Sequence, residues 1–157
     1  MKTKKIFSIG FTSILIILGI FAGTASACYE GCTIGFWKNH EEAWVATGLN
    51  PDDTVGDLFD IPDKFSDFED VKLIDALKFK GGRGIEGGFR LLIKQAVAAA
   101  LNIRHPCVNY WYPSFVDFET FRAQTATHLE VDDRPGLVAA ADFLDQYNNM
   151  GCPEGCI

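Results

Sequence analysis

Residues 28–44 read C-Y-E-G-C-T-I-G-F-W-K-N-H-E-E-A-W, and this stretch sets the expectations for the whole fold. It holds two of the five cysteines, two of the three tryptophans and one of the three histidines. Its C-x-x-x-C spacing returns near the other end of the chain, at Cys152 and Cys156. Because an exported chain uses such cysteines as a disulfide framework, we expect the two chain ends to meet and to be stapled together around a helical core.

The stretch follows directly behind a segment with the features of a secretory signal. Residues 1–27 begin with three lysines, continue with an apolar run over 6–21 and end in Ala25-Ser26-Ala27, a small-x-small cleavage pattern. An uncleaved membrane anchor is the alternative, since the run approaches the length that spans a bilayer. We expect cleavage, which leaves residues 28–157 as a single domain outside the cell or at its surface, where disulfides are stable.

The mature chain is strongly acidic. The signal segment removes three of the 14 basic residues and none of the 21 acidic ones, which leaves a net charge of −10. This charge argues against nucleic acid and against anionic lipid as partners, because both select basic surfaces. It is compatible with a soluble extracellular protein and with the binding of cations.

Helical spacing of apolar residues accounts for most of the mature chain. The predicted helices span about 35–46, 67–79, 89–103, 115–129 and 134–150, with one short helical stretch at 54–59. The helix at 89–103 has apolar residues on most sides, so we expect it to be the most buried element. Since no convincing pair of strands occurs, the predicted fold class is all-α, a compact bundle of about five helices.

Five glycines fall within residues 80–88, K-G-G-R-G-I-E-G-G, just before the central helix. A phosphate-binding loop is one interpretation, but the G-K-[ST] ending and the preceding strand of such loops are missing. We favour a tight connection between two closely packed helices, because glycine lets the backbone turn sharply.

Three motifs, taken in order, resemble the pattern of a family of uncharacterised secreted modules from bacteria and archaea. That family opens with Cys-Thr…Gly-[Phe/Tyr]-Trp-Lys-[Asn/Thr]-His, and residues 32–40 read C-T-I-G-F-W-K-N-H, slightly shorter between Thr and Gly. The family's Leu-x-Ala-Leu…Gly-Gly…Ala-Leu-Leu-Asn block is similar to residues 73–102, and its Asn-x-x-Gly-Cys-Pro ending to residues 148–153. The resemblance covers most of the mature chain and implies a secreted module, without implying an activity.

His40 is the leading candidate for chemistry. It lies on an aromatic helix face with Phe36 and Trp44, and Trp37 lies beside that face. There it could ligate a metal or act as a general base. We favour the alternative of a structural histidine packed between Phe36 and Trp44.

The sequence offers two kinds of candidate metal ligand. His105 and His128 could join His40 in a zinc site only if the fold brings them together, and no zinc-ligand spacing supports this. Acidic clusters at residues 52–60, 67–70 and 132–133 could bind Ca²⁺ through oxygen ligands. None of these clusters has the spacing of an EF-hand, so we expect helix caps and solvated loops, and no cofactor.

The segment Tyr110, Trp111 and Tyr112 forms an aromatic connector between two predicted helices. Exposed, it would be a stacking platform for a sugar or a protein partner. Buried, it would fill the core around a turn that ends at proline. Both interpretations stay open.

The odd number of cysteines leaves two schemes open, and both contain a Cys32–Cys152 disulfide. In the scheme that we favour, Cys28 pairs with Cys156 and Cys107 is a free thiol. In the other, Cys28 follows a lipobox-like string and carries a lipid anchor, while Cys107 can pair with Cys156. A membrane contact is expected only through that anchor.

These observations favour an exported, non-catalytic module that binds a protein, a glycan or a cation. The candidate binding residues are Trp37, His40, Trp44, Tyr110, Trp111 and Tyr112. The alternative is a small extracellular hydrolase that uses His40 with a carboxylate. A cleft that holds His40 beside an acidic side chain would favour the enzyme, and a closed core with an exposed patch at residues 110–112 would favour the binder.

Overall fold

The computed structural model describes residues 29–110 and 117–154, and in this part of the chain the fold is all-α. The elements are α1 (Ile34–Asn39), η1 (Glu41–Thr47), α2 (Val55–Leu58), η2 (Asp63–Phe68), α3 (Leu73–Ala76), α4 (Gly84–Arg104), α5 (Phe118–Leu129) and α6 (Arg134–Asn148), where η marks a 3-10 helix. Extended pairing among the described residues is limited to two isolated bridges, Gly31 with Gly151 and Thr54 with Lys72. The predicted helical fold is confirmed.

Residues 1–27, the expected signal segment, lie outside the described residues, as do Cys28, Trp111, Tyr112 and Cys156. Within the described ranges, every helix is too short or too polar to cross a membrane.

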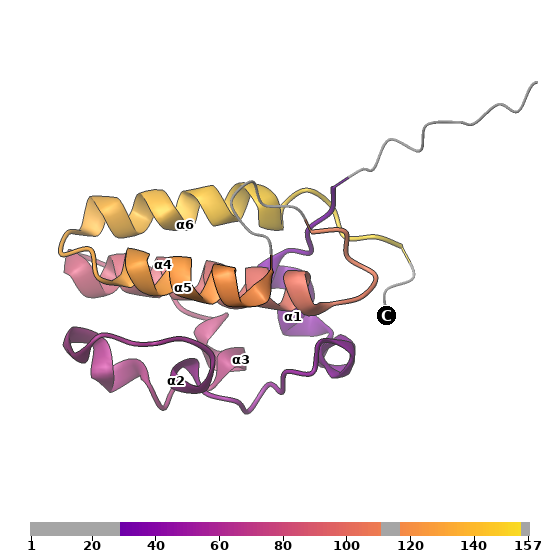
Figure 1. Cartoon of the computed structure of the whole chain (residues 1–157), viewed down its shortest axis with the longest axis horizontal. Helices are drawn as coiled ribbons and strands as arrows, with labels where there is room; N and C mark the ends of the chain where they lie inside the picture. Colours follow the sequence, from indigo (N-terminus) through magenta and orange to yellow (C-terminus); the bar gives the residue numbers. More distant parts are fainter. Residues whose placement is uncertain (1–28, 111–116, 155–157) are drawn as a thin grey trace, which may run out of the picture.

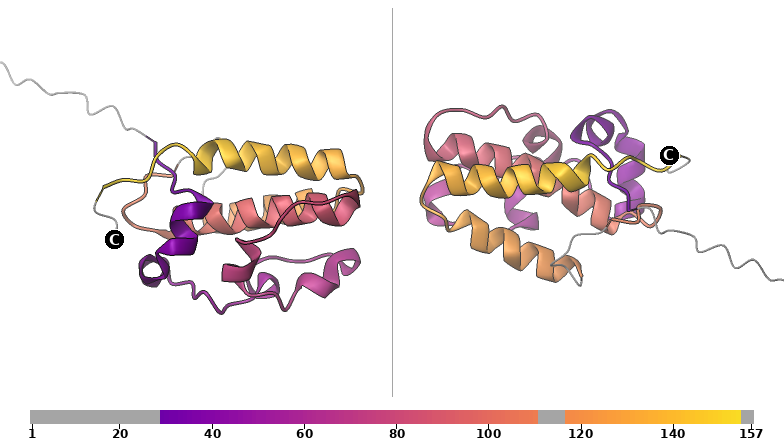
Figure 2. Two further views of the ribbon diagram at one scale, coloured as in Figure 1. Left: turned by 180° about the vertical axis from the view of Figure 1, so that it is seen from behind. Right: turned by 90° about the horizontal axis from the view of Figure 1, so that it is seen from above.

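The helices lie in tiers (Figure 1). Helix α6 forms the top tier, α4 and α5 the middle one, and α2 and α3 lie below. Seen from above, α6 runs along the line between α4 and α5 (Figure 2), and it packs against both. Helix α1 packs against α4, so the N-terminal motif at residues 32–40 is attached to the central helix.

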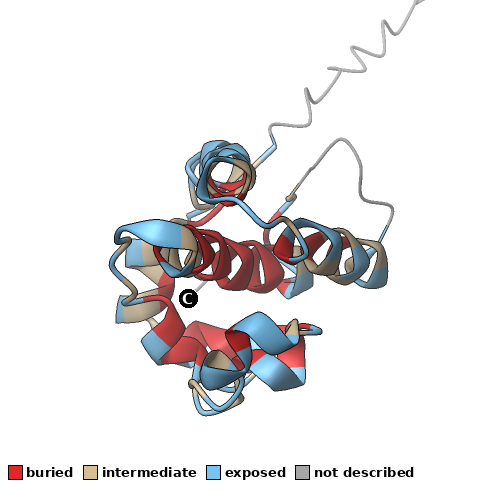
Figure 3. Cartoon of the chain, turned by 90° about the vertical axis from the view of Figure 1, so that its left-hand side faces the viewer, coloured by how far each residue is buried: buried red, intermediate tan, exposed pale blue. Residues whose placement is uncertain are grey.

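Helix α4 is the centre of the fold. Most of its 21 residues are buried, including the unbroken run from Gln95 to Asn102 (Figure 3). Four of these buried positions are alanines, whose small side chains let neighbouring elements approach from several sides. The prediction that this helix is the most buried element is confirmed.

The glycine-rich segment belongs partly to α4, which begins at Gly84 and not at residue 89. A Cβ atom on Gly87 would collide with the backbone of Gly82, and one on Gly88 would lie 3.0 Å from the Cβ atom of Leu137 in α6. The expected connection is therefore shorter than predicted. Its last two glycines lie inside the helix and allow the preceding loop and α6 to pack closely against it.

The expected helix at 35–46 is interrupted at His40, which separates α1 from η1. The His40 ring nitrogen Nδ1 lies 2.9 Å from the carbonyl oxygen of Phe36. In a continuous α-helix that carbonyl would accept the backbone N–H of residue 40, so the side chain replaces the backbone at this position. The chain continues as a tighter 3-10 helix that ends at Gly48, whose φ is +72°.

The lower tier also departs from the prediction, since residues 67–79 do not form one helix. The backbone N–H of Val55 donates to the oxygen of Val71, and that of Leu73 donates to the oxygen of Asp53. These bonds hold the chain around Lys72 in an extended conformation, so only η2 and α3 remain helical. Two aromatic rings attach this tier to α4, with the Phe65 and Phe68 centroids 4.3 and 4.7 Å from that of Phe89.

The two ends of the described chain meet, as expected. The backbone N–H of Gly31 donates to the oxygen of Gly151, and a disulfide joins Cys32 to Cys152 across 120 sequence positions. In the chain-entropy model, closing a loop of this length stabilises a fold by about 4–5 kcal/mol.

Candidate functional site

Cys32 and Trp37, two residues of the N-terminal motif at residues 32–40, bond to a cluster of buried amides in the core, at the end of the bundle where the ends of the described chain meet. We define this amide cluster as the side chains of Gln95, Asn102 and Asn148, all of which are buried. Gln95 and Asn102 belong to α4, and Asn148 is the last residue of α6. The cluster therefore connects the central helix to the start and to the end of the folded chain.

The side-chain amide of Asn102 uses all of its donor and acceptor positions, mostly to bind the N-terminal segment. Its Oδ1 accepts hydrogen bonds from the backbone N–H of Cys32 at 2.8 Å and from the indole Nε1 of Trp37 at 3.2 Å. Its Nδ2 donates to the carbonyl oxygen of Cys32 at 2.9 Å and to Oδ1 of Asn148 at 3.1 Å. An amide with two donors and two acceptor sites is fully used in this arrangement.

Asn148 extends the cluster to its other members. Its Oδ1 also accepts from the hydroxyl of Tyr110 at 3.0 Å, and its Nδ2 donates to both the backbone and the side-chain oxygen of Gln95. Gln95 in turn donates to Asp145, close to the surface. Every buried side-chain nitrogen or oxygen in the described part of the chain has a partner. A fully satisfied network of this kind favours one arrangement of the core over its alternatives.

Sequence reasoning did not single out the amide cluster, although a signal was present. Leu137, Ala141, Leu144 and Asn148 follow one another at the spacing of a single helix face. A polar residue on an apolar stripe is buried when the stripe is buried, and a buried amide requires hydrogen-bonding partners. The position of Asn148 thus indicated a partnered amide, but the identity of its partners depended on the tertiary structure.

The two tryptophans proposed for binding lie wholly inside the core. Trp37 donates to Asn102, and the indole nitrogen of Trp44 donates to the carbonyl oxygen of Trp37 at 2.9 Å. Neither side chain offers a surface to a partner.

His40 is half-buried and stacks on Phe36, with ring centroids 4.5 Å apart and an interplanar angle of 25°. Its hydrogen bond to the Phe36 carbonyl is internal to this turn of the chain. Among the described residues, no carboxylate forms a hydrogen bond or an ion pair with His40. The geometry needed for a histidine–carboxylate pair is therefore missing in this part of the protein.

The other two histidines occupy different environments. His105 is buried beside Trp37, with the ring centroids 5.8 Å apart, and its Nδ1 accepts from the backbone N–H of Cys107. Burial lowers the pKa of His105 below its ordinary value of 6.5, because the core disfavours the charged ring. His128 is exposed on α5. The described residues contain no group of three or more histidine, cysteine or acidic side chains arranged to bind a metal ion.

The acidic residues proposed for calcium serve mainly as helix caps and ion pairs. Asp57 accepts from the Thr54 backbone in a capping box, which lowers the pKa of its carboxyl group, and Asp133 caps α6. Asp52 pairs with Lys72 and Asp132 with Lys64, each at 2.7 Å. These interactions match the expectation of caps and solvated loops.

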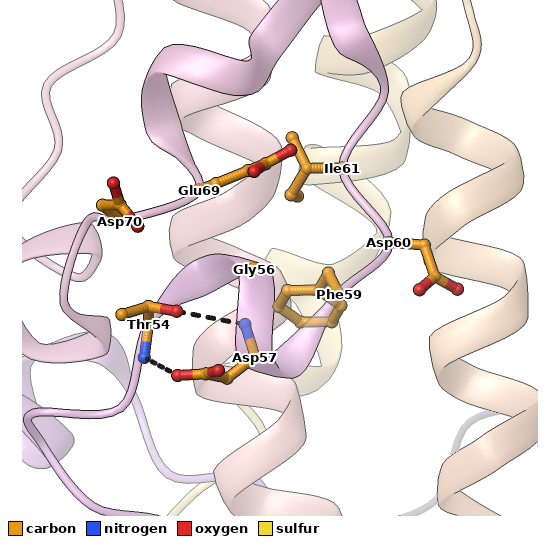
Figure 4. A pocket seen from close by; sticks show the side chains of 8 residues that line it. All are labelled: Thr54, Gly56, Asp57, Phe59, Asp60, Ile61, Glu69 and Asp70. Carbon is orange, nitrogen blue, oxygen red and sulfur yellow. Dashed lines mark hydrogen bonds between the residues drawn. The ribbon is translucent and has the colours of Figure 1, made fainter.

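A shallow hollow of about 440 Å³ nevertheless has an acidic lining (Figure 4). It lies between α2 and the segment after η2, and its carboxylates are Asp57, Asp60, Glu69 and Asp70. In Figure 4 these side chains point in different directions around the hollow instead of toward one centre. A calcium ion needs several oxygen ligands at one point, which this arrangement does not provide.

The aromatic connector is described only at its first residue. Tyr110 is half-buried and is tied to Asn148, so it forms part of the core wall at the amide cluster. The question of a stacking platform at Trp111 and Tyr112 concerns residues outside the described ranges.

The five cysteines are placed in part. The Cys32–Cys152 disulfide is confirmed, and Cys107 is exposed and forms no disulfide with another cysteine of the described ranges. A Cys28–Cys156 disulfide, a lipid on Cys28 and a Cys107–Cys156 disulfide each involve a residue outside the described ranges, so all three stay predictions.

Comparisons of the chain with protein-family models, with curated proteins and with solved structures find no match. The resemblance to secreted modules therefore rests on the three sequence motifs alone.

Proposed function

We propose that this protein is exported and acts as a non-catalytic binding or structural module, outside the cell or attached to its surface. The observation that carries the proposal is that key residues of the three sequence motifs lie inside the core. Cys32, Trp37 and Asn102 bind one another inside a closed core, and Cys152 covalently joins the other chain end to them. Such residues specify a stable fold and are not available to a substrate.

Export is supported by the chemistry of the same region. A disulfide that staples the chain ends suits an oxidising compartment, and the signal-like residues 1–27 directly precede the folded part. The acidic surface favours a partner of neutral or positive charge, such as a protein, a glycan or a cation.

Mass spectrometry of the non-reduced protein from separated membrane and medium fractions tests export. We expect a chain that starts at Cys28, with Cys32 and Cys152 in one linked peptide. An Ala27→Asp variant is the matched control, since an acidic residue at the cleavage position should keep residues 1–27 attached. Wild-type protein that retains these residues, or that carries Cys32 and Cys152 as free thiols, would contradict the proposal.

A His40→Gln variant tests the absence of catalysis. We expect the variant and the wild type to behave identically across a panel of ester, peptide and glycoside substrates. The thermal melt of each protein shows whether the fold is retained. A hydrolytic activity that disappears in a fully folded His40→Gln protein would establish the hydrolase instead.

A further inference from the structure

We propose that the fold itself selects the disulfide: Asn102 docks the backbone of Cys32 in the core before any sulfur–sulfur bond exists, and Cys152 is then the only described cysteine brought to it. The disulfide secures the C-terminal segment onto a core that is already assembled. This inference concerns how the five cysteines are sorted, and it goes beyond the proposed binding or structural role.

The bonds that hold Cys32 do not involve its sulfur atom. Asn102 binds both the N–H and the C=O of Cys32, at 2.8 and 2.9 Å. Trp37 shares the same amide oxygen, and Thr33 caps α1 by accepting from the backbone of Phe36. Cys32 is wholly buried. Because all these contacts are made by backbone, amide and indole groups, a reduced chain can form every one of them.

Cys152 is held much more weakly. It is half-buried, and its neighbour Gly151 accepts the hydrogen bond of Gly31 at 2.9 Å. Gly151 lies two residues beyond the C-cap of α6. The φ angle of Gly151 is +106°, and at this residue the chain turns back toward the N-terminal segment. The two cysteines therefore have different roles. Cys32 is positioned first in the folded core, and Cys152 is brought next to it afterwards.

The chemical step needs an external oxidant, which we take to be a low-molecular-weight disulfide such as oxidised glutathione. The more exposed Cys152 loses its proton, and its thiolate attacks glutathione disulfide, which forms a mixed disulfide and releases one glutathione thiolate. The deprotonated Cys32 then attacks the Cys152 sulfur and releases the second glutathione. Two cysteines are oxidised, and one glutathione disulfide is reduced to two glutathiones.

Alkylation of the fully reduced wild-type protein, as purified from a secreting host, tests whether Cys32 is docked without the disulfide. We expect iodoacetamide to modify Cys152 and Cys107 nearly as fast as in urea. Modification of Cys32 should be slower by about a hundredfold, since it requires local opening of the core. Equal rates for Cys32 and Cys152, or a reduced chain that does not fold, would overturn the proposal.

Oxidative refolding of variants tests the role of Asn102. Reduced protein is placed in a glutathione redox buffer, quenched with acid and mapped for disulfides over time. The control is Leu92→Ala, which weakens α4 on the side that faces α5 and leaves the amide cluster intact. We expect the control and the wild type to form Cys32–Cys152 first, and Asn102→Leu to form it about tenfold more slowly than the control and alongside other pairings.

If Asn102→Leu sorts its cysteines as selectively as Leu92→Ala, the proposal is wrong. If Asn102→Leu does not fold at all, the alkylation rates of the reduced wild type decide the question alone.

Discussion

The upper and lower parts of the molecule are built by different means. In the upper part, α4, α5 and α6 are helices of 12 to 21 residues that pack against one another, most extensively α4 against α6. In the lower part, residues 41–79 fold into 3-10 turns and four-residue helices, held by caps, ion pairs and buried apolar side chains such as Trp44, Phe59 and Phe65. The helices of the upper part follow from the helical periodicity of their sequences. The conformation of the lower part depends instead on its tertiary contacts.

Two matched core substitutions should separate the two parts most strongly. Leu101 in α4 and Leu77 beside α3 are both buried, so replacing either by Ala creates a cavity, which costs about 2–5 kcal/mol. We expect Leu101→Ala at the upper end of this range, because long helices cannot collapse into the gap, and Leu77→Ala at the lower end. Urea unfolding measures both. A free energy of unfolding for Leu101→Ala close to the wild-type value would contradict the central position of α4.

The junction of the chain ends offers the next largest effect. A Cβ atom on Gly31 would collide with the backbone of Tyr147 and Asn148 in α6, so Gly31→Ala should destabilise the protein by about 2 kcal/mol. Gly35 is an exposed residue of α1 with room for a Cβ atom, and Gly35→Ala should be neutral or stabilising by up to about 1 kcal/mol. Equal thermal melts for the two variants would show that the ends do not meet.

A helix cap probes the lower part on its own. The Thr54 hydroxyl accepts from the backbone of Asp57, and Thr54→Ala should cost about 1 kcal/mol. Thr127→Ala is the control, since this exposed hydroxyl bonds a carbonyl within α5 and its loss leaves no buried group without a partner. Hydrogen exchange should show faster exchange in residues 55–76 of Thr54→Ala, with little change in α4. A uniform increase across both parts would indicate that they unfold together.

The smallest expected effect is a dependence on pH. Because burial lowers the pKa of His105 in the folded protein, the unfolded chain binds a proton near pH 6.5 and the folded chain only at lower pH. The free energy of unfolding should therefore fall as the pH drops below about 6.5.

Urea titrations between about pH 5 and pH 8 check this. A His105→Asn variant keeps an acceptor near the backbone N–H of Cys107 and should flatten the dependence. The same substitution at the exposed His128 controls for the loss of a histidine as such. If the free energy of unfolding depends on pH identically in the wild type and in His105→Asn, burial of His105 is not the cause of the dependence.

The same division between the two parts decides what could be predicted from the sequence. Helix α4 was predictable because a long run of apolar residues can be satisfied only by burial on most sides. The end-to-end disulfide was predictable in outline from the repeated cysteine spacing. The interruption at His40 was not, since periodicity alone does not show that a side chain will take the carbonyl of Phe36.

The sequence by itself determined the fold class, the central helix and the meeting of the chain ends, because local periodicity and cysteine spacing are carried by neighbouring residues. Only the tertiary structure decided that Asn102 would bind Cys32, 70 positions away, and Asn148, 46 positions away. It also decided that the chain around Lys72, just before α3, would be extended, through bonds between residues 53–55 and residues 71–73. A hydrogen bond between distant residues depends on how whole elements pack, so the local pattern can indicate that a buried amide has partners but cannot identify them.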